Sequence, residues 1–509
     1  MGRLALLSVS DKTGIVEFAR ELVDKYNFEI LSSGGTAKAI KDAGIAVTKV
    51  SDYTGSPEIL GGRVKTLHPR IHGGILARKN LAEDLADLEA NNIRPLDLVA
   101  VNLYPFEETI AQEGVTVAQA IEKIDIGGPA MIRAAAKNYA NLTVLCDPSL
   151  YSAYLEELEK EEVSPEFRQK MAGIAFNRTM AYDGAIANYF SQLNSEDSSD
   201  TYSLKGNKVQ TLRYGENPHQ PAAWYQSSNK GWSSAQQLQG KELSYNNLVD
   251  LEAARRIITE FDPSEPAAAV LKHTNPCGVA VAETLAQAYQ QAFNADSVSA
   301  FGGIVALNQP IDPETANALT NTFLECVVAP GCSNEAREIL SKKSKLRILL
   351  LEDLATGEKQ TIKAIAGGFL IQASDDLIEN PDTWQIVTEK QPTEAEIAEM
   401  LFAQKVVKHV KSNAIVVTKN RTTLGIGAGQ MNRVGSVKIA LEEAKEAIPG
   451  AILASDGFFP FDDSVRTAAA AGIKAIIQPG GSIRDKDSIA AANELGIVMV
   501  LSGTRHFLH

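Results

Sequence analysis

The chain has 509 residues and a formal net charge of −14, from 49 basic and 63 acidic residues. This length indicates about two to four domains, and the acidic balance argues against a nucleic-acid partner bound through a general positive surface. No apolar run reaches the roughly 18–20 residues of a membrane span, and the four cysteines have no paired spacing. We therefore expect a cytoplasmic protein with neither a membrane nor a nucleic-acid partner.

The first part of the chain alternates short apolar runs with helical patterns. Strands are expected over residues 4–9, 28–31, 96–101 and 142–146, and helices over 15–25, 37–43 and 166–190. One face of the first helix is predicted to carry Ile15, Phe18, Ala19 and Leu22, and the apolar positions of the last include Met171, Ile174, Ala175, Met180, Ile186 and Tyr189. Such alternation predicts a parallel sheet covered by helices on both faces.

The segment 191–208 is polar and rich in serine and acidic residues, which is typical of a linker. We place a domain boundary near residue 200, giving domains over 1–200 and 201–509. Beyond it, strands and helices alternate in two blocks, about 250–372 and 393–502. The two blocks have a similar alternation of strands and helices, but their sequences do not align as a repeat. An internal duplication is therefore only a suggestion.

Two glycine- and hydroxyl-rich clusters follow the first two predicted strands. They are Ser8–Lys12 and Ser32–Thr36, and the second opens a helix. Glycines let backbone amides approach an anion, and a helix N-terminus favours negative charge, so a phosphate monoester is the expected guest. The alternative is a plain turn with an N-cap threonine.

Further clusters combine basic, acidic and aromatic side chains. Residues 61–74 hold Arg63, Lys65, His68, Arg70 and His72 between glycine pairs. Pro69 interrupts the two histidines and no carboxylate stands beside either, which argues against a helical zinc pair.

The last cluster of this part is spread over three motifs. Asn102-Leu103-Tyr104-Pro105-Phe106 is followed by residues 124–129 and 134–138. Tyr104, Asp125 and Lys137 would act as acid, base and orienting charge if these loops converge.

These motifs resemble one known family. GGRVKTLHP, NLYPF, IDIGG and AAAKN, in this order and after SVSDKTG and SGGTAKA, are similar to the inosine-monophosphate (IMP) cyclohydrolase domain of the bifunctional purine-biosynthesis family, whose sheet resembles that of methylglyoxal synthase. The resemblance implies phosphate- and nucleotide-binding residues at Ser10, Lys12, Ser33, Gly34, Gly35, Thr36, Arg63, Lys65, Thr66 and Asn102. It implies a ring-closing set at Lys65, Tyr104, Asp125 and Lys137.

The reaction so implied closes the carboxamide nitrogen of a formylated aminoimidazole-carboxamide ribonucleotide (FAICAR) onto its formyl carbon and expels water, giving IMP. In it, Lys65 and Tyr104 would stabilise the developing alkoxide and help the hydroxyl leave. Asp125 and Lys137 would manage the proton that the amide nitrogen loses.

The second part contains a motif, Lys272–Gly278, that combines a base, a cation and amide donors. The apolar run 267–271 before it predicts a buried strand, and ligands gather at the carboxyl ends of strands in open α/β sheets. The alternative is a hydrogen-bonded histidine at a strand end with a solvated lysine. RYGENPHQ (213–220) and VSAFGG (298–303) favour the functional interpretation.

This part resembles the aminoimidazole-carboxamide ribonucleotide (AICAR) transformylase domain of the same family, which implies a duplicated cytidine-deaminase-like α/β fold. The implied catalytic residues are Lys272 and His273. The implied nucleotide-binding residues are Arg213, Tyr214, Gly302, Glu325, Asn413, Arg433, Arg505 and Phe507. The implied folate-binding residues are Val434, Phe458, Asp463, Ser482 and Ile483.

In the reaction implied here, the exocyclic amine of AICAR attacks the formyl group of 10-formyltetrahydrofolate, which is a co-substrate. His273 would accept the amine's proton, and Lys272 would steady the oxyanion. No metal is required. The family further implies a homodimer whose transformylase site is shared between the subunits.

Two other functions compete with this interpretation. A zinc-dependent nucleotide deaminase needs Pro-Cys-x-x-Cys, but the residue three beyond Cys277 is Ala280. A nucleotide-sensing module in one half would not need the intact ring-closing set.

Three local features have separate interpretations. Asp462 is an extra acid that puts contacts to the folate's glutamate tail in doubt, and Cys332 is expected to be a buried, inert thiol. The glycines of residues 425–430 lack the third glycine of a dinucleotide fingerprint.

Overall fold

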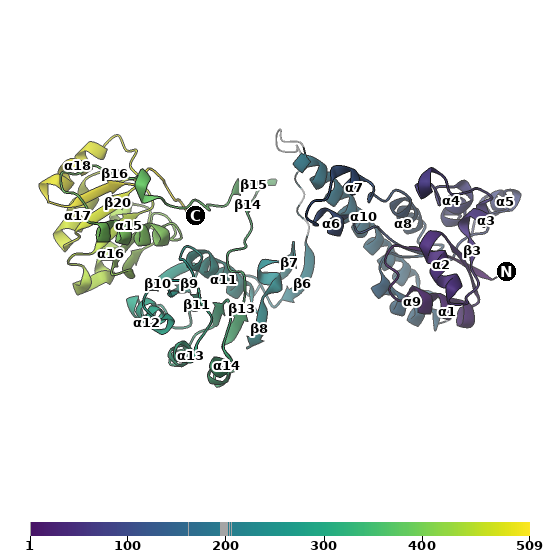
Figure 1. The fold of residues 1–509 in the computed structure, drawn as a ribbon, viewed down its shortest axis with the longest axis horizontal. Coiled ribbons are helices and arrows are strands. Elements are labelled where there is room, and N and C mark those ends of the chain that lie inside the picture. The colour runs from purple at the N-terminus through teal and green to yellow at the C-terminus, as the bar shows by residue number, and fades with distance from the viewer. Residues whose placement is uncertain (1, 161, 194–201, 203, 205) are drawn as a thin grey trace. The chain divides into compact units, whose positions relative to one another are not determined.

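The computed structural model describes residues 2–160, 162–193, 202, 204 and 206–509 (Figure 1). The chain divides into two compact units, Met1–Lys205 and Gly206–His509. Most of the segment 191–208, predicted as a linker, lies outside the described residues. Within the described ranges, none of the helices combines the length and apolar character that a bilayer crossing requires.

The first unit is built on a five-stranded sheet, and every strand pair in it is parallel, as the alternating pattern predicted. From one edge to the other the strands are β3 (Thr48–Lys49), β2 (Phe28–Ser32), β1 (Arg3–Val9), β4 (Leu98–Asn102) and β5 (Thr143–Leu145). β4 and β5 are buried along their whole length. Strands buried on both faces leave polar groups only at their ends, which is where ligands bind in such sheets.

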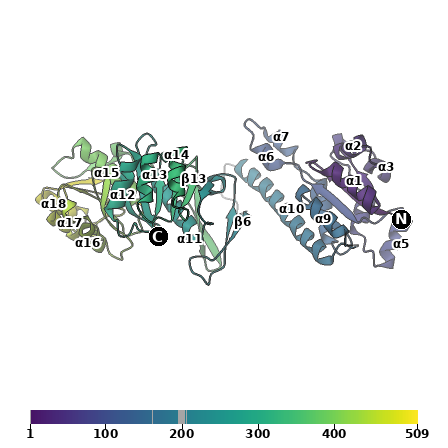
Figure 2. The ribbon, with the colours of Figure 1, turned by 90° about the horizontal axis from the view of Figure 1, so that it is seen from below.

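The helices of this unit form two groups. α1, α2 and α9 belong to one, and α4, α8 and α10 to the other. In chain order the helices are α1 (Ile15–Tyr26), α2 (Gly34–Asp42), α3 (Val50–Thr54), α4 (Pro69–Leu76), α5 (Ala82–Ala90), α6 (Phe106–Ile110), α7 (Val117–Ile121), α8 (Gly127–Lys137), α9 (Tyr151–Leu158) and α10 (Pro165–Leu193). Figure 2 shows the length of α10.

The predicted helix faces are largely confirmed. Ile15, Phe18, Ala19 and Leu22 are the buried residues of α1. The last predicted helix is confirmed as α10, and Met180, one of its apolar positions, is 65% exposed. The start of α2 differs from the prediction: the helix begins at Gly34 and not at Ala37, because Ser33 is already the extended N-cap residue.

The second unit is built on a mixed sheet of twelve strands. Their order is β16 (Gln385–Ile386), β21 (Val498–Leu501), β20 (Ala475–Gln478), β19 (Ile452–Ser455), β17 (Ile415–Lys419), β18 (Thr422–Gly427), β10 (Asn275–Val281), β9 (Ala267–Lys272), β11 (Ile304–Leu307), β12 (Cys326–Ala329), β13 (Arg347–Leu350) and β8 (Gln236–Gln239). β10 and β18 meet antiparallel at the centre. The strands on either side of this pair mirror one another in order.

The suggested internal duplication is therefore visible in the topology. Each half runs helix, β-hairpin, helix and then three strands separated by two helices. The first half contains α11 (Tyr245–Ile258), α12 (Leu285–Ala295), α13 (Pro313–Thr320) and α14 (Asn334–Ser341). The second contains α15 (Glu394–Val407), α16 (Arg433–Ala444), α17 (Asp463–Ala471) and α18 (Asp485–Glu494).

Helices cover both faces of this sheet. α11 and α15 share one apolar core with strands of both halves. On the other face the core around α12, α13 and α14 is separate from the core around α16 and α17. The halves are therefore joined by the central strand pair and by one common core.

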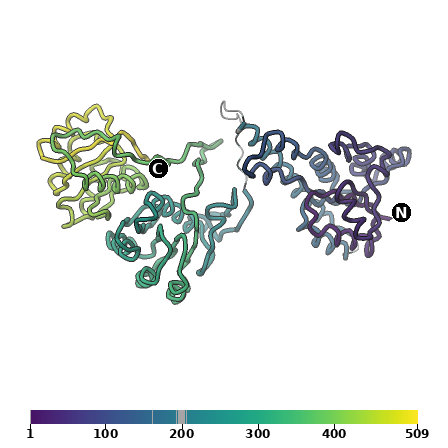
Figure 3. Tube along the Cα trace, in the orientation of Figure 1, coloured from purple at the N-terminus to yellow at the C-terminus, as the bar shows by residue number. Residues whose placement is uncertain are grey.

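Two small hairpins lie outside the large sheet. β6 (Asn207–Leu212) pairs with β7 (Ala222–Gln226), and β14 (Gln360–Ile365) pairs with β15 (Gly368–Ala373). Figure 3 shows the chain passing through the second hairpin between the halves. Ile365 and Leu370 of this hairpin are 50% and 57% exposed.

Candidate active sites

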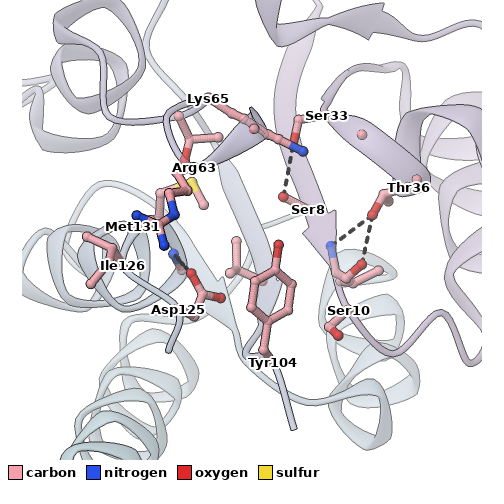
Figure 4. A pocket seen from close by; sticks show the side chains of 18 of the residues that line it. Ser8, Ser10, Ser33, Thr36, Arg63, Lys65, Tyr104, Asp125, Ile126 and Met131 are labelled. Carbon is pink, nitrogen blue, oxygen red and sulfur yellow. Dashed lines mark hydrogen bonds between the residues drawn. The ribbon is translucent and has the colours of Figure 1, made fainter. Parts of the chain in front are cut away.

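The first unit contains a cavity of about 680 Å³ at the carboxyl ends of β1, β2 and β4 (Figure 4). Small-molecule sites typically fall in this range of volume. The cavity is lined by twelve of the thirteen residues predicted for this unit: Ser10, Lys12, Ser33, Gly34, Gly35, Thr36, Arg63, Lys65, Thr66, Asn102, Tyr104 and Asp125. Lys137 is the one that is not among them.

The N-terminus of α2 lies at one end of this cavity, under two lysine side chains. A Cβ built on Gly34 would lie 3.3 Å from Lys65 Nζ, and one built on Gly35 would lie 3.3 Å from Lys12 Cε. Gly34 has φ of 52°, a conformation that glycine adopts without strain. Unpaired helix amides beside two ammonium groups make a cradle for a phosphate.

Thr36 and Asn102 hold the loop after β1 through hydrogen bonds. Thr36 Oγ1 accepts from Val9 N at 3.0 Å and donates to Val9 O at 2.9 Å. Asn102 Oδ1 accepts from Ser10 N at 2.6 Å and from Asp11 N at 3.0 Å. Both side chains are buried. They shape the cavity wall and leave Ser10 and Lys12 to face its interior.

Asp125 lies between β4 and α8, opposite the lysines. Its carboxylate accepts hydrogen bonds from the backbone N–H groups of Gly128, at 2.8 Å, and of Tyr104 and Gly127. Burial raises the pKa of Asp125, although these hydrogen bonds oppose the rise. A Cβ on Gly128 would lie 2.5 Å from Asp125 Oδ2, so only glycine leaves room for the carboxylate. Tyr104 is 44% exposed and stands beside Asp125 in the open part of the cavity (Figure 4).

Tyr182 of α10 supports this carboxylate and was not predicted from the sequence. Its hydroxyl accepts from Asp125 N at 2.8 Å and donates to Lys123 O at 3.0 Å. Tyr182 is buried, and its ring contacts that of Phe106 edge to face. The helical pattern placed this residue in α10, but no local signal tied it to Asp125, which is 57 residues earlier.

Lys137 does not join the other ring-closing candidates. It is the last residue of α8, whereas Asp125 precedes the first. An eleven-residue helix is roughly 16 Å long, so the two lie at opposite ends of it. Lys137 instead lines a separate hollow with Leu76, Arg133, Tyr139 and Phe176, among others.

The basic cluster 61–74 divides between the cavity and the scaffold. Arg63 is ion-paired with Glu122, and Lys65 Nζ lies 3.2 Å from Glu58. Arg70 packs over the Tyr53 ring and donates to Asn92 O. His68 caps α4 by accepting from Arg70 N. Only the first half of this cluster, up to Leu67, lines the cavity.

In the second unit the candidates gather at one edge of the large sheet. β9, β18, β19, β20 and β21 end there, and β10, β11, β12 and β13 begin there, as the parallel and antiparallel pairings require. The sequence pointed to strand carboxyl ends alone. Because the sheet is mixed, Gly302 and Glu325 reach the same edge although they precede β11 and β12.

The predicted strand 267–271 is confirmed as the buried β9, and a two-residue turn joins it to β10. His273 and Thr274 form this turn with φ of 53° and 65°. Non-glycine residues seldom adopt positive φ, and two-residue hairpins favour Asn-Gly here. His273 is exposed, and Lys272 Nζ donates to Phe301 O at 2.6 Å.

Polar contacts join two of the neighbouring candidate segments to the start of α11. Asn247 of α11 donates to Glu325 Oε2 at 2.9 Å. Asn246 beside it donates to Glu216 O at 3.4 Å, which places the loop of Arg213 and Tyr214 against the start of α11. That loop presents a guanidinium stacked 5.4 Å from a tyrosine ring centroid.

Arg433 sits in a buried network and is 6% exposed. Its guanidinium is ion-paired with Asp456 and donates to Ser455 Oγ at 2.9 Å and to Asn413 Oδ1 at 2.7 Å. A Cβ on Gly457 would lie 2.5 Å from Arg433 Nη2 and 2.7 Å from the Phe507 ring. Arg433 thus orders the candidate residues around it, and little of its own surface is free for a ligand.

His506 stands between two predicted nucleotide-binding residues but was not itself predicted. Its Nδ1 lies 2.6 Å from Asp375 and its Nε2 lies 2.7 Å from Glu379. Burial alone would lower the pKa of His506, but the two carboxylates raise it to about 9. The charged ring therefore ties the C-terminal tail to the segment after β15. Arg505 and Phe507, whose side chains stack at 4.5 Å, are held on either side of this anchor.

The five folate candidates lie in the three segments that follow β18, β19 and β20, at the same edge. Val434 is at the start of α16, Phe458 follows β19, Asp463 begins α17, and Ser482 and Ile483 follow β20. Phe458 is 38% exposed and Ile483 is fully exposed. Asp462, the extra acid, pairs with Arg466 at 2.7 Å, so its charge is engaged within α17.

Three remaining expectations can be placed in the structure. Cys332 is only half-buried, so the prediction of a buried thiol is wrong, although burial does raise the pKa of Cys332. Cys277 and Ala280 lie within β10, and among the described residues no three His, Cys, Asp or Glu side chains are grouped to hold a metal ion. Gly425 and Gly427 let α16 approach, because a Cβ on either would lie 2.0 Å from a helix carbonyl oxygen.

Comparison with known proteins accounts for both units. A model of the MGS-like domain matches residues 14–130, and a model described as AICARFT/IMPCHase bienzyme matches residues 135–443. The chain is 72% identical to the bifunctional purine biosynthesis protein PurH of Gloeothece citriformis and 71% identical to that of Rippkaea orientalis, with 100% of both chains covered. A solved structure described as the crystal structure of ForH is 39% identical to this chain. The match covers 38% of this chain and 100% of the ForH chain, with a TM-score of 0.35.

Proposed function

Because this chain belongs to the AICARFT/IMPCHase bienzyme family, we propose that its two compact units each perform one of that family's two reactions. The chain is a bifunctional AICAR formyltransferase and IMP cyclohydrolase of de novo purine biosynthesis, and its family uses 10-formyltetrahydrofolate as the formyl donor. We assign ring closure to Met1–Lys205 and formyl transfer to Gly206–His509. We place the enzyme in the cytoplasm, since its four cysteines are free, as is usual in a reducing compartment.

The observation that carries the first assignment is the meeting of a phosphate cradle with Tyr104 and Asp125 in one cavity. The phosphate of FAICAR would lie at the α2 N-terminus, between Lys12 and Lys65. The imidazole ring would then extend toward Tyr104 and Asp125. The position of Lys65 over Gly34 supports a phosphate-binding role more directly than a ring-closing one.

In this proposal Asp125 is the base of ring closure. The carboxamide nitrogen forms a bond to the formyl carbon and loses a proton to Asp125, and the formyl oxygen becomes an alkoxide. Tyr104 donates a proton to that oxygen, which becomes a hydroxyl. Asp125 then returns its proton to the hydroxyl, which leaves as water, while the former formamide nitrogen gives its proton to the Tyr104 phenolate as the ring becomes aromatic. The raised pKa of Asp125 suits a group that must both accept and return a proton.

The second assignment is supported by the turn that presents His273 at the edge where the nucleotide and folate candidates gather. The amine nitrogen of AICAR bonds to the formyl carbon of the folate, and His273 accepts the proton that the amine loses. The bond from the formyl carbon to the folate nitrogen then breaks, and that nitrogen takes up the proton. Lys272 stabilises the tetrahedral oxyanion between these steps.

We propose that neither reaction requires a metal, and we expect IMP to form in the presence of a chelator. AICAR and 10-formyltetrahydrofolate would be incubated with chelator-treated enzyme, and FAICAR would be separated from IMP. Formation of both products at the untreated rate supports the proposal. Loss of both products, restored by adding zinc, would instead support a zinc-dependent reaction.

We propose that the enzyme is a homodimer that shares its transformylase site between subunits, with the β14–β15 hairpin in the interface. Apolar side chains exposed on one hairpin are a surface that a second copy would cover. Leu370→Glu is expected to shift the mass measured by light scattering from dimer to monomer and to reduce formyl transfer, while ring closure continues. Leu495→Glu, which charges an exposed leucine elsewhere, is the control. An unchanged mass for Leu370→Glu would place the interface elsewhere.

A further inference from the structure

The carboxylate of Asp250 in α11 holds the backbone of the His273–Thr274 turn. Asp250 Oδ1 accepts from Thr274 N at 2.7 Å, and the backbone N–H of His273 also points to this carboxylate. Both turn residues have positive φ, which is uncommon for residues other than glycine and especially unfavourable for β-branched threonine. The turn sequence offers no Asn-Gly pair to favour this shape. An external acceptor is therefore needed to hold it.

The second half of the unit repeats this arrangement without a histidine. Asn420 and Arg421 form the turn between β17 and β18 with φ of 56° and 55°. Glu399 Oε2 accepts from Arg421 N at 2.7 Å. Asp250 and Glu399 each stand five residues after the first residue of their helices, α11 and α15. The same contact thus recurs at equivalent positions.

Other contacts around the two turns also correspond. Lys272 donates to Phe301 O at 2.6 Å, and Lys419 donates to Pro449 O at 2.9 Å. Each carbonyl precedes a positive-φ glycine, Gly302 or Gly450, just before the next strand of its half. The two turns are therefore copies of one structural device.

What differs between the copies is the side chains that the turn presents. The first copy presents His273, which is exposed at the candidate site. In the second, asparagine takes that position, and the next residue, Arg421, is paired with both carboxylate oxygens of Glu265 at 2.6 and 2.9 Å. Glu399 makes the same backbone contact in a turn that has no histidine. This contact therefore serves the backbone of the turn and not proton transfer.

We propose that Asp250 is a positioning residue for formyl transfer, fixing the turn so that His273 faces the substrate amine. This inference rests on the role of His273 proposed above. Asp250 acts through the backbone N–H groups of the turn and does not touch the substrate. Losing it would leave the nucleotide site in place and turn the histidine away from the reacting atoms.

The test uses the full-length enzyme with Asp250→Ala, Asp250→Asn and the matched control Glu399→Ala. We expect Asp250→Ala to lower kcat for formyl transfer by about 10²-fold, the cost of a small misplacement of a catalytic group, with KM for AICAR unchanged. Asp250→Asn keeps an oxygen that accepts from Thr274 N and is expected to restore most of kcat. Glu399→Ala removes the same contact from the other turn and is expected to leave kcat unchanged.

The remaining outcomes each overturn a distinct statement. A rise in KM with kcat unchanged for Asp250→Ala would mean that this carboxylate touches the substrate. Equal losses of kcat in Asp250→Ala and Glu399→Ala would mean that both carboxylates serve stability alone. The same conclusion would follow if both variants lowered the melting temperature equally and Asp250→Ala showed no selective loss of kcat. Full formyl transfer by His273→Ala would refute the role of His273 itself. Ring closure by the first unit is measured for every variant as well, and a normal rate shows that intact enzyme was assayed.

Discussion

His273→Ala is expected to reduce formyl transfer to AICAR by about 10²- to 10⁴-fold, the usual contribution of a general base. The reason is that the amine must lose a proton as its nitrogen bonds to the formyl carbon, and His273 is the exposed base on the candidate edge. Ring closure of added FAICAR is expected to continue at the normal rate. The measurement follows consumption of 10-formyltetrahydrofolate and, separately, IMP formed from FAICAR.

The second half of the sheet supplies the control for this variant. Asn420→Ala changes the residue at the same place in the equivalent turn, where no base is present. It is expected to leave formyl transfer unchanged. If both variants lost activity equally, the loss would come from damage to the sheet, and the assignment of His273 would be refuted.

Asp125→Asn is expected to stop ring closure and make FAICAR accumulate, with a loss of about 10²- to 10⁴-fold in IMP formation from FAICAR. An amide in this position cannot accept the proton from the carboxamide nitrogen. Formyl transfer is expected to be unaffected. Product separation over time would show FAICAR rising without IMP.

The pH dependence of ring closure tests the same assignment. Burial raises the pKa of Asp125 above its ordinary value of 3.8, so the carboxyl takes up its proton at a higher pH than an exposed aspartate does. The wild-type rate is expected to fall as the pH drops through this raised pKa. The residual rate of Asp125→Asn should show no such fall. If the rate of this variant still fell at low pH, the titrating group would be a residue other than Asp125.

Lys137→Ala tests whether Lys137 takes part in ring closure. The family resemblance implies that it does, whereas its position outside the cavity indicates that it does not. Because Lys137 lies at the far end of α8 and outside the cavity, its loss is expected to leave ring closure close to the wild-type rate. A loss as large as that of Asp125→Asn would contradict this expectation. Lys137 would then have to act at a site that residues of a second copy complete.

The parts predicted correctly from the sequence are those in which local pattern and tertiary packing agree. The face of α1 was predicted because four buried apolar residues recur at helical spacing. β9 was predicted because a short apolar run was bounded by polar residues. Twelve of the residues that the family resemblance implied for the first unit line one cavity, because the motifs that carry them lie at strand ends of the same sheet.

The parts that were missed depend on contacts between distant segments. The turn of His273 and Thr274 has no sequence signal, because Asp250, in another element, holds it. Tyr182 reaches Asp125 from a helix with no motif of its own. His506 is tied to carboxylates more than a hundred residues away, 131 in the case of Asp375. The family resemblance groups Lys137 with Asp125, but the length of α8 separates the two residues.

The shared core beneath α11 and α15 determines how the second unit unfolds. Across the central seam, β10 and β18 have one paired register position, Ala280 with Thr422, so the ladder alone joins the halves weakly. The common core contains residues of both helices and of strands on both sides of that seam, and separating the halves would expose it. Loss of either half would therefore leave the other with an uncovered apolar layer. Although its topology is duplicated, the unit should melt in a single cooperative transition, and neither copy is an independently exchangeable module.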